Sequence, residues 1–335
     1  MTIKVARSGF ARRTAIVLIG AAAAIVGAEG QVFAQTEKTL RFGHMWPPND
    51  VWGQGAQRFA ELVKQRTGGK YDVRVYPSGQ LGNEREMEEG LQLGNLDLTF
   101  GGSDVLSQFE PKMAVFALPF MFRDYEHSNA VLDGPLGQKV HEALRQRGIR
   151  VLAAGAQGFR YVLTQKPVNT IADMKNLKIR VPEGEVMLRL FQLVGASPVS
   201  IPWPETYMAA KNNVVDGLEG VPLVLLNFKM YEAGKHVAKT RHVLATLNLL
   251  ISDKVFQALP PDVQKTVQQS ASEAWGWARE EAKAGNEKAE EQLAKLGVQF
   301  TSPDVKPFQE AVRPYWSEWA AKTNSADIVE AIQKM

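Results

Sequence analysis

Apolar residues in the first hundred positions repeat at two different spacings, which predict strands and helices in turn. Residues 39–43 and 71–77 place apolar side chains at every second position, as half-buried strands do. Between them, residues 52–67 repeat apolar side chains at helical spacing and end before two glycines, a typical helix stop. We expect a short helix over 84–93 and a third strand over 96–100. This order indicates a mostly parallel sheet with helices on both faces.

The same alternation returns in the second half of the chain. Strands are expected over 148–154, 177–181, 214–219 and 242–251, where apolar runs end at glycine, proline or polar residues. A short helix capped by Thr170 and Asp173 is expected, and further helices over 187–194, from 204 onward, over 261–296 with a break at Gly276 or Gly285, and over 305–334.

Two α/β units joined by more than one crossing predict a two-lobed α/β protein with a ligand cleft between the lobes. A long C-terminal helix is expected to cross both lobes. We assign residues 35–158 and about 246–285 to lobe I, and residues 159–245 and about 286–335 to lobe II.

The first 34 residues have the pattern of a cleavable secretory signal peptide. Basic residues precede an apolar run of about 13 residues, and Val32-Phe33-Ala34 favours cleavage between Ala34 and Gln35. The alternative is a membrane anchor, but a spanning helix needs roughly 20 apolar residues. Arg12-Arg13 lacks the phenylalanine expected of a twin-arginine signal. We therefore expect an exported, periplasmic protein.

Charge and cysteine content narrow the function further. The leader holds four basic residues and one acidic residue, so 35 of each sign remain after cleavage. Nucleic-acid-binding domains carry clustered excess Lys and Arg, so no nucleic-acid partner is expected. The chain has no cysteine, which excludes a lipid-modified N-terminus, and a chain of this length needs no disulfide to form a core.

Polar and aromatic residues near the predicted strand ends are the candidates for a ligand site, because open α/β sheets bind ligands beyond the carboxyl ends of their strands. Two arginines in one cleft suit a carboxylate, since each guanidinium fork can pair with both oxygens. The candidates are Met45, Trp46, Gly102, Ser103, Arg160, Arg180, Trp203, Glu219 and Gly220.

Taken alone, each of these residues also has an ordinary structural interpretation. An arginine at a strand end is usually solvated or paired with a surface acid, and Glu219 could simply neutralise a buried arginine. Trp203 suits an interface or a core, and Asp216 a turn. For His44 a structural role is the better interpretation.

Several motifs resemble the solute-binding proteins of TRAP (tripartite ATP-independent periplasmic) transporters, the DctP-type family. The resemblance covers nearly all of residues 38–316, in register. It rests on Tyr76-Pro-Ser-Gly-Gln-Leu-Gly82, Phe116-Ala-Leu-Pro-Phe120, Phe122-Arg-Asp-Tyr125, Lys166-Pro-Val-Asn-Thr-Ile-Ala-Asp-Met174, Leu177-Lys-Ile-Arg-Val-Pro182, Val194-Gly-Ala-Ser-Pro198, Glu205-Thr-Tyr207 and Val215-Asp-Gly-Leu-Glu-Gly-Val-Pro222.

The resemblance implies a periplasmic-binding-protein fold that closes over its ligand by a hinge. It implies that Arg180 pairs with a ligand carboxylate, that Arg160 supports this pairing, and that Trp203 lines the pocket. It also implies delivery of the ligand to the membrane permease subunits of a TRAP transporter. No catalytic residue, metal or cofactor is expected.

Three positions depart from the sialic-acid binders of this family. Gly102 and Gly220 stand where those proteins carry polar residues, and Met45 stands where they have asparagine. A sugar acid rich in hydroxyls would leave polar groups poorly paired, which is costly. We therefore expect a less polar monocarboxylate, such as an aromatic or aliphatic 2-oxo or 2-hydroxy acid.

Three alternative functions stand beside this interpretation. An exported hydrolase is disfavoured because the chain has no Gly-x-Ser-x-Gly elbow, no His-Glu-x-x-His and no cysteine nucleophile. A binding protein of an ABC importer, or a protein that presents ligand to a sensor, would share the two-lobed design, and the sequence does not separate them.

Overall fold

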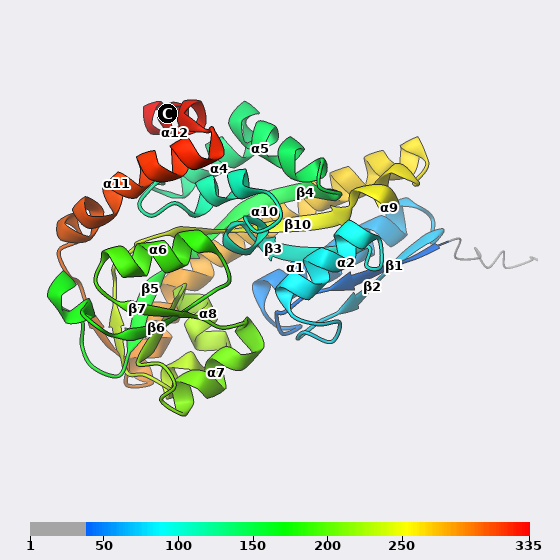
Figure 1. Cartoon of the computed structure of the whole chain (residues 1–335). Helices are drawn as coiled ribbons and strands as arrows, with labels where there is room; N and C mark the ends of the chain where they lie inside the picture. The colour runs from blue at the N-terminus through cyan, green and yellow to red at the C-terminus, as the bar shows by residue number, and fades with distance from the viewer. Residues whose placement is uncertain (1–37) are drawn as a thin grey trace, which may run out of the picture. The chain divides into compact units, whose positions relative to one another are not determined.

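A computed structural model of the protein describes residues 38–335, so the signal peptide expected over 1–34 lies outside the described residues. The strands form two sheets (Figure 1). Sheet A has the order β2-β1-β3-β10-β4, and sheet B has the order β11-β9-β5-β8-β6-β7. Sheet A contains β1 (Lys38–Gly43), β2 (Tyr71–Tyr76), β3 (Leu98–Gly102), β4 (Ile149–Phe159) and β10 (Leu244–Ser252). Sheet B contains β5 (Tyr161–Thr164), β6 (Lys178–Val181), β7 (Ser197–Ser200), β8 (Gly217–Gly220), β9 (His236–Ala238) and β11 (Gln299–Thr301).

The helices are interleaved with the strands. Between β1 and β4 lie α1 (Val51–Arg66), α2 (Glu84–Leu93), α3 (Ser103–Leu106), the 3₁₀ helix η1 (Pro111–Ala117), α4 (Tyr125–Asp133) and α5 (Pro135–Arg145). Between β5 and β9 lie η2 (Ile171–Met174), α6 (Glu185–Leu193), α7 (Trp203–Lys211), α8 (Pro222–Asn227) and η3 (Met230–Glu232). The remaining helices are α9 (Asp253–Gln257), α10 (Pro261–Lys295), α11 (Lys306–Thr323) and α12 (Ala326–Lys334).

One strand in each sheet runs against the others, so the sheets are mixed and only mostly parallel. In sheet A, β10 is antiparallel to β3 and β4. In sheet B, β5 is antiparallel to β8 and β9. Both reversed strands are entered directly from the other sheet: β4 continues into β5, and β9 leads into β10. A strand entered this way, with no crossover helix, can run opposite to neighbours that are joined by βαβ units.

The expected break in the long C-terminal helix was wrong, because α10 runs without interruption from Pro261 to Lys295. Its two glycines have other surroundings. A side chain at Gly276 would meet nothing within 4 Å, whereas one at Gly285 would come to 3.2 Å from Leu223 of α8. Gly285 thus lies where another helix approaches closely.

Aromatic packing fixes α10 to sheet A. The ring of Trp275 lies 4.9 Å from that of Phe100 in β3 and 5.0 Å from that of Trp52 in α1. All three side chains are buried. A separate apolar cluster joins sheet B to α6. It includes Ile179 of β6 and Phe191 of α6.

Three segments of chain pass between the two sheets: Arg160, residues 239–243, and α10. Two of them are joined to each other, since the backbone N–H of Arg160 donates to the Val243 carbonyl at 2.8 Å. On α10, the buried side chain of Asn286 donates to Gln157 O at 2.8 Å and accepts from Leu223 N at 3.0 Å. It thereby ties β4 to α8.

The last two helices return to the side of sheet A. α12 packs on α5, and Lys139 pairs with Asp327 at 2.7 Å. His127 of α4 contacts the Ile332 carbonyl through Nε2 at 3.0 Å. None of the helices in residues 38–335 combines the length and the apolar character that crossing a membrane requires.

Candidate functional site

A cavity of about 80 Å³ lies between the two sheets, and both contribute walls to it. A space of this size holds several waters or a small organic molecule. On the side of sheet A it is lined by Met45, Trp46, Glu84, Gly102, Asp104, Val105, Gln157, Thr246 and Leu247. On the side of sheet B it is lined by Arg180, Pro182, Trp203, Gly220, Val221, Val224 and Phe228, with Arg160 at the crossing.

Seven of the nine site residues expected from sequence therefore meet at one cavity. The other two, Ser103 and Glu219, do not line it. Ser103 accepts hydrogen bonds from Thr246 at 2.7 Å and Asn248 at 3.1 Å, so it holds α3 against β10. Glu219 is completely buried behind Arg160.

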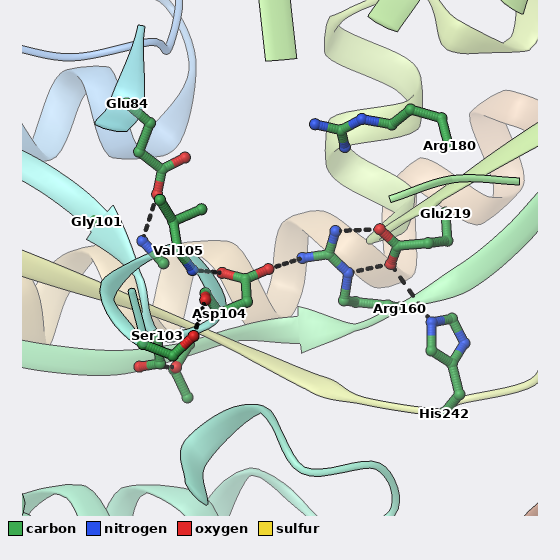
Figure 2. Close-up of polar contacts among 12 residues, drawn as sticks. Glu84, Gly101, Ser103, Asp104, Val105, Arg160, Arg180, Glu219 and His242 are labelled. Carbon is green, nitrogen blue, oxygen red and sulfur yellow. Dashed lines mark hydrogen bonds and ion pairs between the residues drawn. The ribbon is translucent and has the colours of Figure 1, made fainter. Parts of the chain in front are cut away.

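Arg180 is a buried cation without a carboxylate partner. Only 2% of its surface is exposed, and its Nε donates to the Ile201 carbonyl at 2.8 Å. Among the described residues it forms no ion pair, and it stands apart from the network of contacts in Figure 2. Burial lowers its pKa to about 10, helped by the charge of Arg160 and opposed by that of Glu219. An anion beside this guanidinium would supply the missing charge.

Trp203 covers Arg180 on the sheet B side. The guanidinium carbon of Arg180 lies 5.3 Å from the centre of the Trp203 ring, within the range of a cation–π contact. Phe228 meets the same ring edge-on at 5.0 Å. Trp203 begins α7 directly after Pro202, and Phe228 follows α8, so two helix ends build this wall.

Arg160 is held by two carboxylates. Its Nε and Nη2 donate to the two carboxylate oxygens of Glu219, and Nη1 lies 3.6 Å from Asp104 (Figure 2). Glu219 belongs to β8 of sheet B, and Asp104 to α3, which follows β3 of sheet A. Burial opposes ionisation of Glu219, but the charges and hydrogen bonds of Arg160 and His242 together outweigh it and lower the pKa to about 2.

Glu219 has a second partner in the crossing segment. His242 Nε2 lies 3.4 Å from Glu219, and its Nδ1 lies 2.7 Å from the Thr240 hydroxyl. Burial lowers the pKa of His242, although Glu219 opposes this shift. Figure 2 shows Asp104, Arg160, Glu219 and His242 as one chain of contacts across the junction.

Carboxyl groups gather on the sheet A side of the cavity. Glu84 accepts from the Gly102 N–H at 2.6 Å, and burial together with the charge of Asp104 raises its pKa to about 7. Burial also raises the pKa of Asp104. Behind them, Glu88 is fully buried and its oxygens have no hydrogen-bond partner within the described chain. Burial raises its pKa well above the ordinary value, which favours the neutral form of Glu88.

The two glycines differ in the space around them. A side chain at Gly102 would place its Cβ 2.3 Å from Asp104 Oδ1, whereas one at Gly220 would come no closer than 3.4 Å to Leu225. The glycine at 102 therefore leaves room for the carboxyl groups of Asp104 and Glu84. In the sequence, Gly102 suggested a wall without polar groups. In the structure, Asp104 and Glu84 supply polar groups at this wall.

His44 has the structural role expected from sequence. It is buried and stacks on Phe100 at 5.1 Å. Within residues 38–335, no group of three or more His, Cys, Asp or Glu side chains is arranged to hold a metal ion.

Sequence reasoning missed Glu84, Asp104, Gln157 and the apolar wall of Val221, Val224 and Phe228. One signal was present for Glu84: Asn83 and Glu86 form a capping box, which starts a helix at Glu84 directly after the Gln-Leu-Gly motif. The wall on α8 gave no signal, because the helix was not expected.

The fold has two mixed sheets flanked by helices and joined by several crossings. Between the sheets lie a cavity and, among the described residues, an arginine without an ion pair. Together these features are typical of a solute-binding protein of the periplasmic type. The chain belongs to the bacterial extracellular solute-binding protein family 7, the DctP family, whose model matches residues 42–323. It is a TRAP-transporter solute-binding protein, as the sequence motifs predicted. Members of this family are periplasmic, bind small acids and work with membrane permease components.

Three similar proteins illustrate the family. The 2,3-diketo-L-gulonate-binding periplasmic protein YiaO of Escherichia coli is 30% identical over 89% of this chain and 92% of its own length. A TRAP periplasmic solute-binding protein from Xanthobacter autotrophicus Py2, solved with β-D-galacturonate, is 31% identical with a TM-score of 0.85, covering 88% of this chain and 99% of its own. One from Bordetella bronchispeptica, with density interpreted as pantoate, is 32% identical with a TM-score of 0.85, covering 88% and 98%.

These neighbours confirm the two-lobed periplasmic-binding fold. The relatives are transporter binding proteins and not enzymes.

Replacing Arg160 by Met should lower the free energy of unfolding of the ligand-free protein by about 3–5 kcal/mol, because Glu219 would remain as an uncompensated buried charge. Denaturant unfolding at neutral pH measures this. The double variant Arg160→Met/Glu219→Leu removes both charges and should recover most of the loss. A single variant as stable as the parent protein would show that the ion pair has no structural role.

Glu84 should make stability fall as pH rises. Between the ordinary pKa of 4.5 and its raised pKa of about 7, the folded protein keeps a proton that the unfolded chain has released. The free energy of unfolding therefore decreases through this window, by at most about 1.4 kcal/mol per pH unit, and the contribution is lost above about pH 7. Comparing the parent protein with Glu84→Gln between pH 4.5 and 8 isolates this effect. A difference that stays constant with pH would contradict the assignment.

Proposed function

We propose that this protein captures a small organic monocarboxylate and delivers it to the membrane permease of a TRAP transporter. The observation that carries the proposal is the unpaired, buried guanidinium of Arg180 in a cavity between the sheets. A carboxylate is a natural partner, because its two oxygens match the guanidinium fork.

Arg160 supports this pairing without being its centre. Its Nε and Nη2 donate to Glu219 and its Nη1 lies 3.6 Å from Asp104, so its charge is already paired with two carboxylates. The remaining function of Arg160 toward the ligand is electrostatic: it adds positive potential beside Arg180 and keeps Glu219 ionised. Arg180 then makes the direct contact.

The cavity walls favour an acid with polar groups near its carboxylate and an apolar remainder. Glu84, Asp104 and Gln157 line one side and can exchange hydrogen bonds with hydroxyl or oxo groups. Val221, Val224 and Phe228 line the other side, and Trp46 and Met45 add apolar surface on the sheet A side. A 2-hydroxy or 2-oxo acid with an aliphatic or aromatic tail fits both sides.

The acids named for the two solved neighbours mark the range to be tested. Pantoate is a 2-hydroxy acid with a branched aliphatic carbon, and galacturonate is a monocarboxylate with hydroxyls around its ring. We infer that this chain favours the pantoate-like chemistry, because its α8 wall offers no polar partner to a ring of hydroxyls. Tight binding of a uronate would overturn this part of the proposal.

Ligand screening tests the substrate class. Thermal unfolding of the exported chain is measured with a panel of 2-hydroxy acids, 2-oxo acids, uronates and amino acids, each acid paired with its uncharged methyl ester or amide. A ligand at about 100 times its dissociation constant adds roughly 2.7 kcal/mol of stability. The acids should raise the midpoint and their uncharged forms should not. Arg180→Ala should weaken binding of the best acid by about 3–5 kcal/mol.

A matched control separates this effect from a general loss of charge. Arg74 is an exposed arginine in β2, remote from the cavity lining, and Arg74→Ala should bind as the parent protein does. Equal binding of the acid and its ester, or a loss under tenfold in Arg180→Ala, would remove Arg180 from the central role.

A further inference from the structure

A second polar contact joins the two sheets outside the cavity. The side-chain amide of Asn227 donates to Asp50 Oδ2 at 2.7 Å. Asp50 precedes α1, the helix that follows β1 of sheet A, and Asn227 is the last residue of α8, which follows β8 of sheet B. The two residues are 177 positions apart in sequence.

Asp50 is buried, with 2% of its surface exposed. Its Oδ1 caps α1 by accepting from Trp52 N at 2.9 Å, and its Oδ2 accepts from Asn227. Burial raises its pKa, while these two hydrogen bonds oppose the shift. A buried carboxylate that loses a donor bears a desolvation cost, so the amide of Asn227 matters more here than it would in water.

This contact lies directly behind the apolar wall of the cavity. Trp46 lines the cavity four residues before Asp50, and Val224 and Phe228 line it on either side of Asn227. The chain turns between Trp46 and Asp50, where the Asp50 N–H donates to the Pro47 carbonyl at 3.0 Å. A hydrogen bond between Asp50 and Asn227 therefore holds Trp46 against the α8 wall.

Ligand entry requires this wall to open. Arg180 is 2% exposed and Trp46 is 8% exposed, and the lining comes from both sheets. Separation of these two sets of residues would expose Arg180 further to a ligand. Such a separation would also part Asp50 from Asn227 and expose both to water.

We propose that Asp50 and Asn227 form a clasp that closes the cleft and slows ligand release. The clasp contributes to the closed state only, because the open state replaces it with water. A more exposed contact between the two sides serves for comparison. This contact, between Arg85 of α2 and Glu183, spans 3.7 Å, and the Arg85 side chain is 47% exposed. Exposed ion pairs contribute little.

The test compares Asn227→Ala with the parent protein. Because the proposal does not depend on which acid is the natural ligand, the probes are pantoate and galacturonate, and binding is followed by stopped-flow fluorescence. The dissociation rate should rise about tenfold while the association rate changes less than twofold. Unfolding of the ligand-free protein should be unchanged, which a merely structural role would not predict. Asn227→Asp, which sets two carboxylates together, should have the larger effect.

Two variants serve as controls. Asn212 is an exposed asparagine just after α7, and Asn212→Ala should change no rate. Arg85→Ala removes the exposed contact and should change dissociation less than twofold. A dissociation rate unaffected by Asn227→Ala, or one that changes equally in Asn212→Ala, would overturn the proposal.

Closure itself is read without ligand, so a failed ligand assignment does not obscure the result. The chain has no cysteine, and the exposed Leu93 and Met208 lie beside sheets A and B. Dyes attached to the double variant Leu93→Cys/Met208→Cys report the distance between them by energy transfer. Asn227→Ala should lower the closed fraction about tenfold. Identical distance distributions in the two proteins would contradict the clasp even if neither acid binds.

Discussion

Two arginine charges are buried where the sheets meet, and the structure resolves their cost in different ways. Arg160 is neutralised from both sides by Glu219 and Asp104. Arg180 is more deeply buried than Arg160, yet within residues 38–335 its Nε donates to a backbone carbonyl and its guanidinium forms no ion pair. A buried charge without a partner has a high desolvation free energy. Of the two arginines, Arg180 bears this cost, and a bound anion would offset it. In the proposed function, selection of an anionic ligand follows from this asymmetry.

The topology explains why these charges lie together. Arg160 is the single residue between β4 and β5, and Val243, which accepts its N–H, lies in the segment that leads into β10. The side chain of Arg160 therefore extends from the crossing itself. Its two carboxylate partners come one from each sheet, so the same ion pairs that neutralise Arg160 also connect the sheets. Arg180 lies in β6, beside β8 and Glu219. The fold thus links the electrostatics of the site to the relative placement of its two walls.

Much of this arrangement was predictable from local patterns. The alternation over 39–43 and 71–77 and the apolar run over 242–251 indicated β1, β2 and β10. Arg180 and Trp203, whose roles the family resemblance implied, both line the cavity. What local patterns could not reveal were relations between distant segments. The four residues of β5 carry no clear period, and its reversed direction depends on β4 entering from the other sheet. Glu84 and Asp104 look like ordinary first-turn helix acids until β3 and α2 are packed together. The α8 wall was missed because the six helical residues that begin at Pro222 are too few for a periodic signal.

A crystal structure with a bound acid tests the central claim most directly. The acid is the one from the screening panel that raises the unfolding midpoint most. The account predicts that its carboxylate lies within hydrogen-bonding distance of both terminal nitrogens of Arg180, while Arg160 keeps its pairing with Glu219. A carboxylate bound instead to Arg160, with Glu219 displaced, or one held away from both arginines, would contradict it.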